Sequence, residues 1–180
     1  MLNELLDLLL GDTITRFVFF PSFAALPLLF LGRASARTVK LYALFVALVE
    51  LALIAIFTAS HWGGGTMPAR DATLTWLDFG SLRVLYEVGV DGISLPLVLL
   101  TGLLLPLVIL GSWRGITKHW TGFAASMLFL TTGMLGALVA LDLLVFYVFW
   151  EVMLIPMYVI IGIWGGDRRV YAAVKFFLFT

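Results

Sequence analysis

The 180-residue sequence contains no cysteine, only two histidines and few charged side chains. The absence of cysteine excludes disulfide bonds, thiol catalysis and iron–sulfur ligation by this chain. His61 and His119 lie far apart, so we predict no metal site and expect both at the membrane interface. Charged residues make up 12% of the chain and hydrophobic residues 62%, against about 25% and 45–50% in soluble domains. Too few charges remain to cover a water-facing surface, which indicates an integral membrane protein.

The net charge is zero, and so no basic field points to nucleic acid as a partner; the bilayer is the expected surrounding. The first twelve residues have no basic lead-in and carry Glu4, Asp7 and Asp12, so they do not fit a cleaved signal peptide. Their leucines recur on one helical face. We therefore expect a short helix that lies in the membrane interface.

Five apolar runs are long enough to cross a bilayer, which takes about 20 residues. The predicted spans cover residues 14–31, 41–59, 93–110, 122–141 and 143–164. Residues 60–90 are of mixed composition and are predicted to form one long loop. A sixth span begins at Val170 and is still apolar at Thr180. The expectation is an all-α, polytopic transmembrane helix bundle with five full spans and a truncated sixth, from the N-terminal part of a longer protein.

The basic residues test this count, because cytoplasmic loops are enriched in Lys and Arg. With six crossings, three alternate loops would hold Arg33, Arg37, Lys40, Arg114, Lys118, Arg168 and Arg169. The opposite side would hold Arg16, Arg70, Arg83 and most of the acidic residues. The asymmetry predicts basic loops in the cytoplasm and an N-terminus outside.

Glu151 stands alone in the apolar run "LVFYVFWEVMLIP" of the fifth span. It lies about 12 Å along that helix, inside the hydrocarbon core, where a charge costs at least ~2.5–3.5 kcal/mol. A carboxyl that must stay protonated or find a partner has a proton affinity set by its surroundings, which a proton relay requires. Pro156 frees the carbonyl of Val152 and bends the helix. Tyr147 and Tyr158 offer hydroxyls on roughly the same face. The alternative is a carboxyl that only ties two helices together by hydrogen bonds.

Two other ionisable residues lie within predicted spans. Glu50 has no polar neighbour in the second span, and a packing hydrogen bond is at least as good an interpretation as a place in a proton path. Lys175 lies five residues into the sixth span, where its stem can reach the interface or its amine can face a proton path.

The fourth span carries small residues at i, i+4 spacing, Gly133 with Ala137 and Gly136 with Ala140, which predict close packing of a neighbouring helix. Thr131 and Thr132 of the same span could line a wet path. No nucleotide, phosphate or haem motif is present, and no cofactor-binding residue is predicted.

Two stretches resemble a known family: "GVDGISLPLVLLTGLLLPLVILGSW" (89–113) and "LDLLVFYVFWEVMLIPMYVIIGIWGGDRRVYAAVKFFLFT" (141–180). They are similar to the M subunit of bacterial NADH-quinone oxidoreductase, which is chain 4 of mitochondrial complex I. Over residues 1–88 the likeness is loose. The resemblance implies an antiporter-like inverted-repeat fold. Residues 1–120 would form an N-terminal three-helix region with the interfacial helix and outer loop, and residues 121–180 the beginning of the proton-translocating domain.

The resemblance further implies that Glu151 is the functional glutamate of the fifth helix, whose lysine partner lies on a later helix that the sequence does not reach. The function implied is proton translocation by a respiratory translocase in the bacterial inner membrane. NADH, FMN, iron–sulfur clusters and quinone would be bound by partner subunits, and the L- and N-type antiporter-like subunits would be neighbours. The alternatives are a D-type subunit of a multisubunit sodium/proton antiporter and a purely structural scaffold.

Overall fold

The computed structural model of the chain describes residues 12–30, 35–62, 69–78 and 83–180. Their elements follow in this order: α2 (Thr13–Phe30), α3 (Ala36–His61), β1 (Ala69–Asp78), β2 (Arg83–Val90), α4 (Ser94–Gly115), α5 (Trp120–Val139), α6 (Leu143–Trp164) and α7 (Arg169–Phe179). The interfacial helix predicted for the first dozen residues lies almost wholly outside the described residues.

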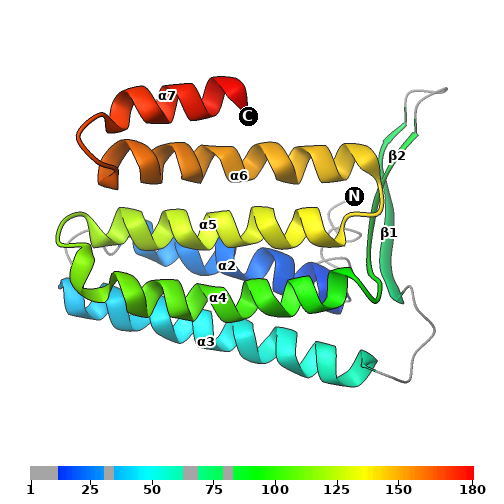
Figure 1. The fold of residues 1–180 in the computed structure, drawn as a ribbon. Helices are drawn as coiled ribbons and strands as arrows, with labels where there is room; N and C mark the ends of the chain where they lie inside the picture. The colour runs from blue at the N-terminus through cyan, green and yellow to red at the C-terminus, as the bar shows by residue number, and fades with distance from the viewer. Residues whose placement is uncertain (1–11, 31–34, 63–68, 79–82) are drawn as a thin grey trace.

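The helices lie side by side in one bundle with the hairpin of β1 and β2 across one end (Figure 1). α5 is the central helix, because it packs against α2, α4 and α6. α3 runs along α4 and also contacts α2 and α5, while α7 packs on the outer side of α6. The apolar side chains form two buried clusters, one toward the hairpin around Ile14, Phe57 and Val88, the other further along around Ala43 and Leu128.

Four of the described helices, α3, α4, α5 and α6, are long and apolar enough to cross a membrane. α2 is also apolar, but its apolar stretch, Thr13–Leu28, is shorter. At about 1.5 Å per residue, the 20 to 26 residues of the four long helices reach about 30 Å or more. The protein is therefore a mostly helical, multi-pass membrane protein.

The hairpin corrects the prediction of an all-α fold and of one long loop over residues 60–90. β1 and β2 pair antiparallel, with Ala69 opposite Val90 and Asp78 opposite Arg83, and two register shifts between them. Along β2, Val84, Tyr86, Val88 and Val90 are buried. This alternation has the period of two that marks a strand with one buried face, and it was present in the sequence.

The hairpin is joined to the bundle by backbone and side-chain bonds. The Leu141 N–H donates to the Glu87 carbonyl at 2.9 Å, and Val88 forms an antiparallel bridge with Ala140. The hydroxyls of Tyr86 and Thr15 are 3.3 Å apart inside the fold. Burial raises the pKa of Tyr86 to about 12, so its hydroxyl keeps its proton at any physiological pH. β2 thus closes the bundle where α5 passes into α6.

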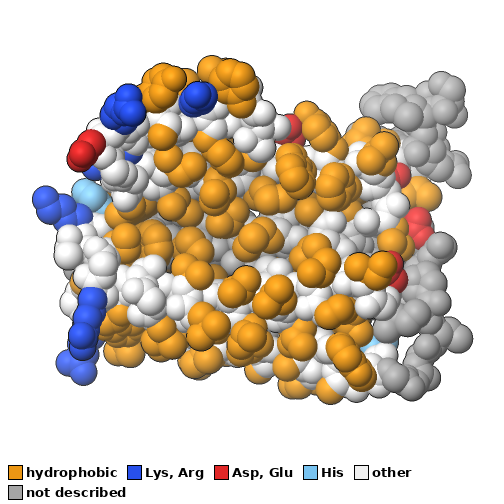
Figure 2. All heavy atoms as spheres, viewed as in Figure 1, with side chains coloured by type: hydrophobic (Ala, Val, Ile, Leu, Met, Phe, Trp, Pro, Cys, Tyr) orange, Lys and Arg blue, Asp and Glu red, His pale blue; other side chains and the backbone are white. Residues whose placement is uncertain are grey.

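The charges separate along the bundle axis. Blue side chains gather at the end opposite the hairpin in Figure 2, while the long face of the bundle in this view shows mainly hydrophobic side chains. That basic end contains the first turns of α3 and α7 and the α4–α5 connection, with Arg37, Lys40, Arg114, Lys118, Arg168 and Arg169. Asp91 and Asp142 lie at the hairpin end, before α4 and α6. Such an asymmetry between the two ends is typical of a membrane protein with one fixed orientation.

Candidate functional site

The helix that carries Glu151 begins at a well-formed cap. Asp142 Oδ1 accepts hydrogen bonds from the N–H groups of Leu144 at 2.8 Å and Val145 at 3.2 Å. From there α6 continues for 22 residues, through Pro156, to Trp164. Proline lacks an N–H, so the carbonyl of Val152, four residues earlier, has no helical donor. The carbonyl freed by the proline therefore belongs to the residue that follows Glu151.

α6 is held against α5 by glycines that leave no room for a side chain. A Cβ built on Gly133 would lie 2.8 Å from the Cβ and 3.1 Å from the backbone N of Met153. A Cβ on Gly136 would overlap the ring of Phe149. The close packing predicted from the small residues of this helix is confirmed. Because Met153 lies two residues from Glu151, this contact also sets the position of the glutamate.

Glu151 lies on an exposed face of α6 in this chain. Its side chain interacts with that of Tyr147, one helical turn earlier, and Tyr147 is 58% exposed. The face also carries large exposed apolar residues such as Ile155 and Leu143. The structure therefore brings Tyr147 to Glu151, and it leaves the carboxyl on a surface that further membrane helices or lipid can cover.

Tyr158 and Lys175 are not brought to Glu151. The Tyr158 ring packs against the Phe177 ring of α7, with centroids 5.8 Å apart. Lys175 Nζ lies 5.9 Å from the ring centroid of its own helix neighbour Tyr171, and no ion pair with Glu151 is formed in the described part of the chain. A cation at this site would have to come from elsewhere.

Glu50 has the opposite surroundings. It is 0% exposed, in the middle of the buried face of α3. Neither carboxyl oxygen has a hydrogen-bond partner. The packing hydrogen bond that was one interpretation of this residue is therefore not formed in this arrangement.

The two threonines that could line a wet path are satisfied inside the bundle. Thr131 donates to the Met127 carbonyl of its own helix at 2.9 Å. Ser22 of α2 donates to Thr132 Oγ1 at 2.8 Å from its hydroxyl and at 3.2 Å from its N–H. The two bonds from Ser22 tie α2 to α5. The hydroxyls of Thr131 and Thr132 therefore both have structural partners.

The basic end contains a cluster of tryptophans that the sequence reasoning missed. Lys40 Nζ donates to the Trp113 carbonyl at 2.7 Å and lies over the rings of Trp113 and Trp120. Trp164 Nε1 donates to the Lys118 carbonyl at 3.0 Å. Tryptophan is enriched at the membrane interface. The occurrence of Trp and Lys at the ends of the predicted spans was the feature of the sequence that could have indicated this cluster.

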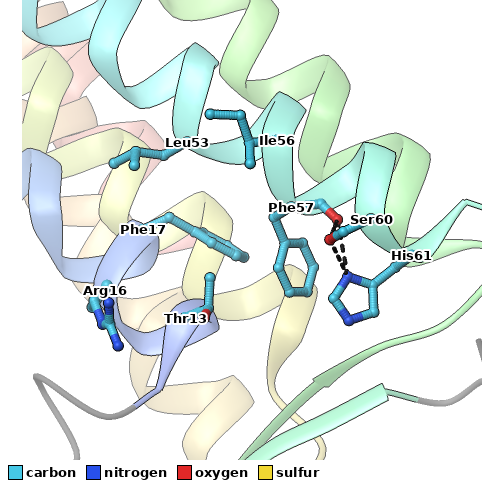
Figure 3. A pocket seen from close by; sticks show the side chains of 8 residues that line it. All are labelled: Thr13, Arg16, Phe17, Leu53, Ile56, Phe57, Ser60 and His61. Carbon is cyan, nitrogen blue, oxygen red and sulfur yellow. Dashed lines mark hydrogen bonds between the residues drawn. The ribbon is translucent and has the colours of Figure 1, made fainter.

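A cavity of about 220 Å³ opens between α2 and α3 at the hairpin end. Figure 3 shows the side chains that line it. Phe17, Leu53 and Phe57 line its apolar side. His61 Nδ1 lies 3.0 Å from Ser60 Oγ and 2.9 Å from the Phe57 carbonyl. Among the described residues, no group of three His, Asp or Glu side chains could hold a metal ion. The lack of a cofactor in this chain remains a prediction.

Comparison with known families places most of the chain. The family described as NADH-ubiquinone oxidoreductase chain 4, amino terminus, matches residues 72–141. The family described as NADH:quinone oxidoreductase/Mrp antiporter, TM, matches residues 140–180, which include α6 and Glu151.

Individual relatives agree. The chain is 37% identical over 171 residues to NAD(P)H-quinone oxidoreductase chain 4, chloroplastic, of Mesostigma viride, covering 93% of this chain and 32% of the relative. It is 38% identical over 168 residues to NAD(P)H-quinone oxidoreductase chain 4 3 of Picosynechococcus, covering 93% of this chain and 30% of the relative. F(420)H(2) dehydrogenase subunit M of Methanosarcina mazei is 40% identical over 108 residues, 60% of this chain and 21% of the relative. The chain thus spans about a third of the length of the chain 4 relatives and belongs to the M-type, or chain 4, family of NADH-quinone oxidoreductase membrane subunits.

Proposed function

We propose that this chain is part of a membrane subunit that translocates protons, driven by electron transfer from NADH to quinone in other subunits of a respiratory translocase. Membership of the chain 4 family supports this function. So does the placement of Glu151, the one acidic residue of α6, on a membrane-spanning helix. The chain contributes no redox chemistry of its own, and NADH, FMN, iron–sulfur clusters and quinone would be bound by the partner subunits.

In this proposal Glu151 is the group that binds and releases the proton. Tyr147 supplies a neighbouring hydroxyl, and the carbonyl of Val152 can hold a water molecule. A change of one pKa unit in such a group corresponds to about 1.36 kcal/mol, while moving one charge against 100 mV costs ~2.3 kcal/mol. Shifts of a few units, imposed by charges on neighbouring helices, are therefore large enough to drive transfer.

The orientation that we propose rests on the distribution of the charges. We propose that α2 crosses the membrane as a first span before the four long helices, with the N-terminus and the hairpin outside and the basic end in the cytoplasm of a bacterial inner membrane. The separation of charge between the two ends supports this orientation. The exposed apolar face of α6 and α7 fits helices of the same membrane arm, among which we include L- and N-type subunits. The proton-translocating region would begin near residue 121, after an N-terminal region of three helices.

The sodium/proton antiporter subunit is not favoured. The description of one matching family includes the Mrp antiporter, but the other names chain 4, as do the chloroplast and cyanobacterial relatives.

The test is the substitution Glu151→Gln in the full-length subunit within the assembled complex. Gln keeps the shape and polarity of a protonated carboxyl but cannot release a proton. We expect proton pumping coupled to NADH oxidation to be lost while the complex still assembles, and we expect Glu151→Asp, the matched control, to retain part of it. Pumping at the wild-type rate in Glu151→Gln would favour the scaffold alternative instead.

A further inference from the structure

Glu50 is a buried acid for which the proposed function has no role. Its carboxyl lies 14 residues after the start of α3 and 11 before its end, which is about 21 Å and about 16 Å from the two ends of the helix. Both oxygens are buried without a hydrogen-bond partner. An ionised carboxylate at such a depth is costly unless it is paired and hydrogen-bonded.

The helices packed against α3 offer no cation at the level of Glu50. Those helices are α2, α4 and α5. α2 has one charged residue, Arg16, in its first turn, and α4 has one, Arg114, in its last turn. α5 has none. The other titratable residues of α3 itself are Arg37, Lys40, Tyr42 and His61.

These residues of α3 are all distant from Glu50 along the helix. Tyr42, the nearest, is eight residues away, about 12 Å, and its hydroxyl donates to the Ala24 carbonyl at 2.8 Å. With no counter-ion beside it, we expect the carboxyl to be neutral and to hold a proton.

A second residue with an unpartnered polar atom lies on the buried side of α3. Within the described part of the chain, three buried side-chain oxygens have no hydrogen-bond partner: both of Glu50 and the Oγ1 of Thr58. The two residues are eight positions apart, so they share a helical face at a distance of about 12 Å, with Ile54 between them. Buried polar groups that lack protein partners are usually hydrogen-bonded to internal water.

Thr58 also lies toward the hairpin end of the bundle. It is three residues before His61, whose imidazole lines the cavity between α2 and α3 (Figure 3). Along α3, Thr58 therefore lies between Glu50 and His61, on the hairpin side of the glutamate.

We propose that Glu50 is a second proton-binding site of this subunit, separate from Glu151, and that it exchanges its proton with the hairpin side of the membrane by way of Thr58. The step is simple: the carboxylate takes up one proton from water on the hairpin side and releases the same proton when its surroundings become less favourable to the neutral form. This proposal rests on the proposed function, because it assumes that the complex pumps protons.

The experiment compares Glu50→Gln and Glu50→Asp with wild type in the full-length, assembled complex. Infrared difference spectra of wild type against Glu50→Gln should show the carbonyl stretch of a protonated carboxylic acid at neutral pH, absent from the variant. Proton pumping per electron should fall several-fold in Glu50→Gln and recover in part in Glu50→Asp. A lost band with unchanged pumping would make Glu50 a neutral structural group, and an absent band in wild type would show that it is ionised; either result overturns the proposal.

The route is tested by Thr58→Val, with Thr131→Val as the matched control. Both substitutions remove a buried hydroxyl, but that of Thr131 is bonded within its own helix. Pumping should slow in Thr58→Val and stay unchanged in Thr131→Val; equal rates in the two variants would refute the role of Thr58. If Glu151→Gln abolishes pumping while Glu50→Gln and Thr58→Val pump normally, the proposed function holds and only the second site fails.

Discussion

Glu50 and Glu151 are the acidic residues within the four described helices that can cross a membrane, and their surroundings are opposite. Glu50 is fully buried on α3, which packs against α2, α4 and α5, and neither of its oxygens has a hydrogen-bond partner. Glu151 lies on an exposed face and interacts with Tyr147. A carboxyl that is fully enclosed must be neutral or hydrated, whereas one on an open face can be controlled by groups on a neighbouring helix. The roles proposed for the two residues differ accordingly: Glu50 is an internal proton-binding site in α3, and Glu151 is a site controlled by neighbouring helices.

We expect the largest effect on stability and pumping from Gly133→Leu. This substitution should displace α6, which carries Glu151, and leave α3, which carries Glu50, in place. The backbone of Met153 is too close to admit a side chain at Gly133. Overpacking of this kind costs about 3 kcal/mol. We expect a lower melting temperature of the purified full-length subunit and loss of pumping.

The matched control for this substitution is Gly111→Leu on α4, where a Cβ meets nothing within 4 Å. It should leave melting and pumping close to wild type. Equal melting of the two variants would show that the α5–α6 contact does not hold Glu151 in position.

Replacing each glutamate by leucine sharpens the comparison through stability. Glu50→Leu removes a buried, unpartnered polar group, which should raise the free energy of unfolding by about 1 kcal/mol. Glu151→Leu lies on an exposed face and should change it little. Thermal unfolding of both variants in detergent measures the difference. A destabilised Glu50→Leu would mean that protein groups or internal water form hydrogen bonds with the carboxyl in the assembled protein.

Tyr147→Phe tests whether Glu151 depends on its neighbour. The substitution removes one hydroxyl and keeps the ring, and a single hydrogen bond contributes about 0.5–1.5 kcal/mol. We expect a modest slowing of pumping and a shift in its pH profile. Tyr158→Phe, the control on the same helix, should leave the profile unchanged, because Tyr158 packs against Phe177 instead.

The smallest effect concerns the hairpin end and the start of α4. The N–H groups of Ser94 and Ile93 donate to Asp91 Oδ1 at 2.7 and 2.9 Å, and these bonds, that of Ser94 first, lower the pKa of Asp91. Because the pKa is lower in the folded state, the contribution to stability is present above the unfolded value of about 3.9 and is lost as the pH falls through the folded value.

Asp91→Ala should therefore lower the melting temperature slightly at pH 7 and not at the acidic end of the range. Asp167→Ala, at the basic end, is the control. A pH-independent difference between the Asp91 variant and wild type would show that the charge of Asp91 does not contribute.

The sequence predicted the helices well, because each long apolar run has only one stable form in a bilayer. The helix boundaries of α6 at residues 143 and 164 agree with the prediction. The prediction from the sequence missed the hairpin, because the mixed composition of residues 60–90 hid the alternation of Val84, Tyr86 and Val88. The role proposed for Thr58 could not be predicted either, because it depends on the burial of this hydroxyl and on its missing hydrogen-bond partner, which the sequence does not show.

The candidate site was predictable in its residue types and not in its contacts. Glu151 is evident in the sequence as a lone charge at membrane depth. That Tyr147 meets it, and that Lys175 does not, depends on where α6 and α7 face. The sequence alone allowed a contact of Glu151 with either Tyr147 or Lys175.

The hydrogen bond from the Leu141 N–H to the Glu87 carbonyl joins β2 to the connection between α5 and α6. The same strand runs at once into the Asp91 turn that starts α4. α4 and α6, which both pack against α5, are therefore both attached to β2 at the hairpin end of the bundle. A displacement of the hairpin would therefore move the near ends of α4 and α6 together, and a tilt of α6 about this attachment would be largest at its other end, beside the basic residues.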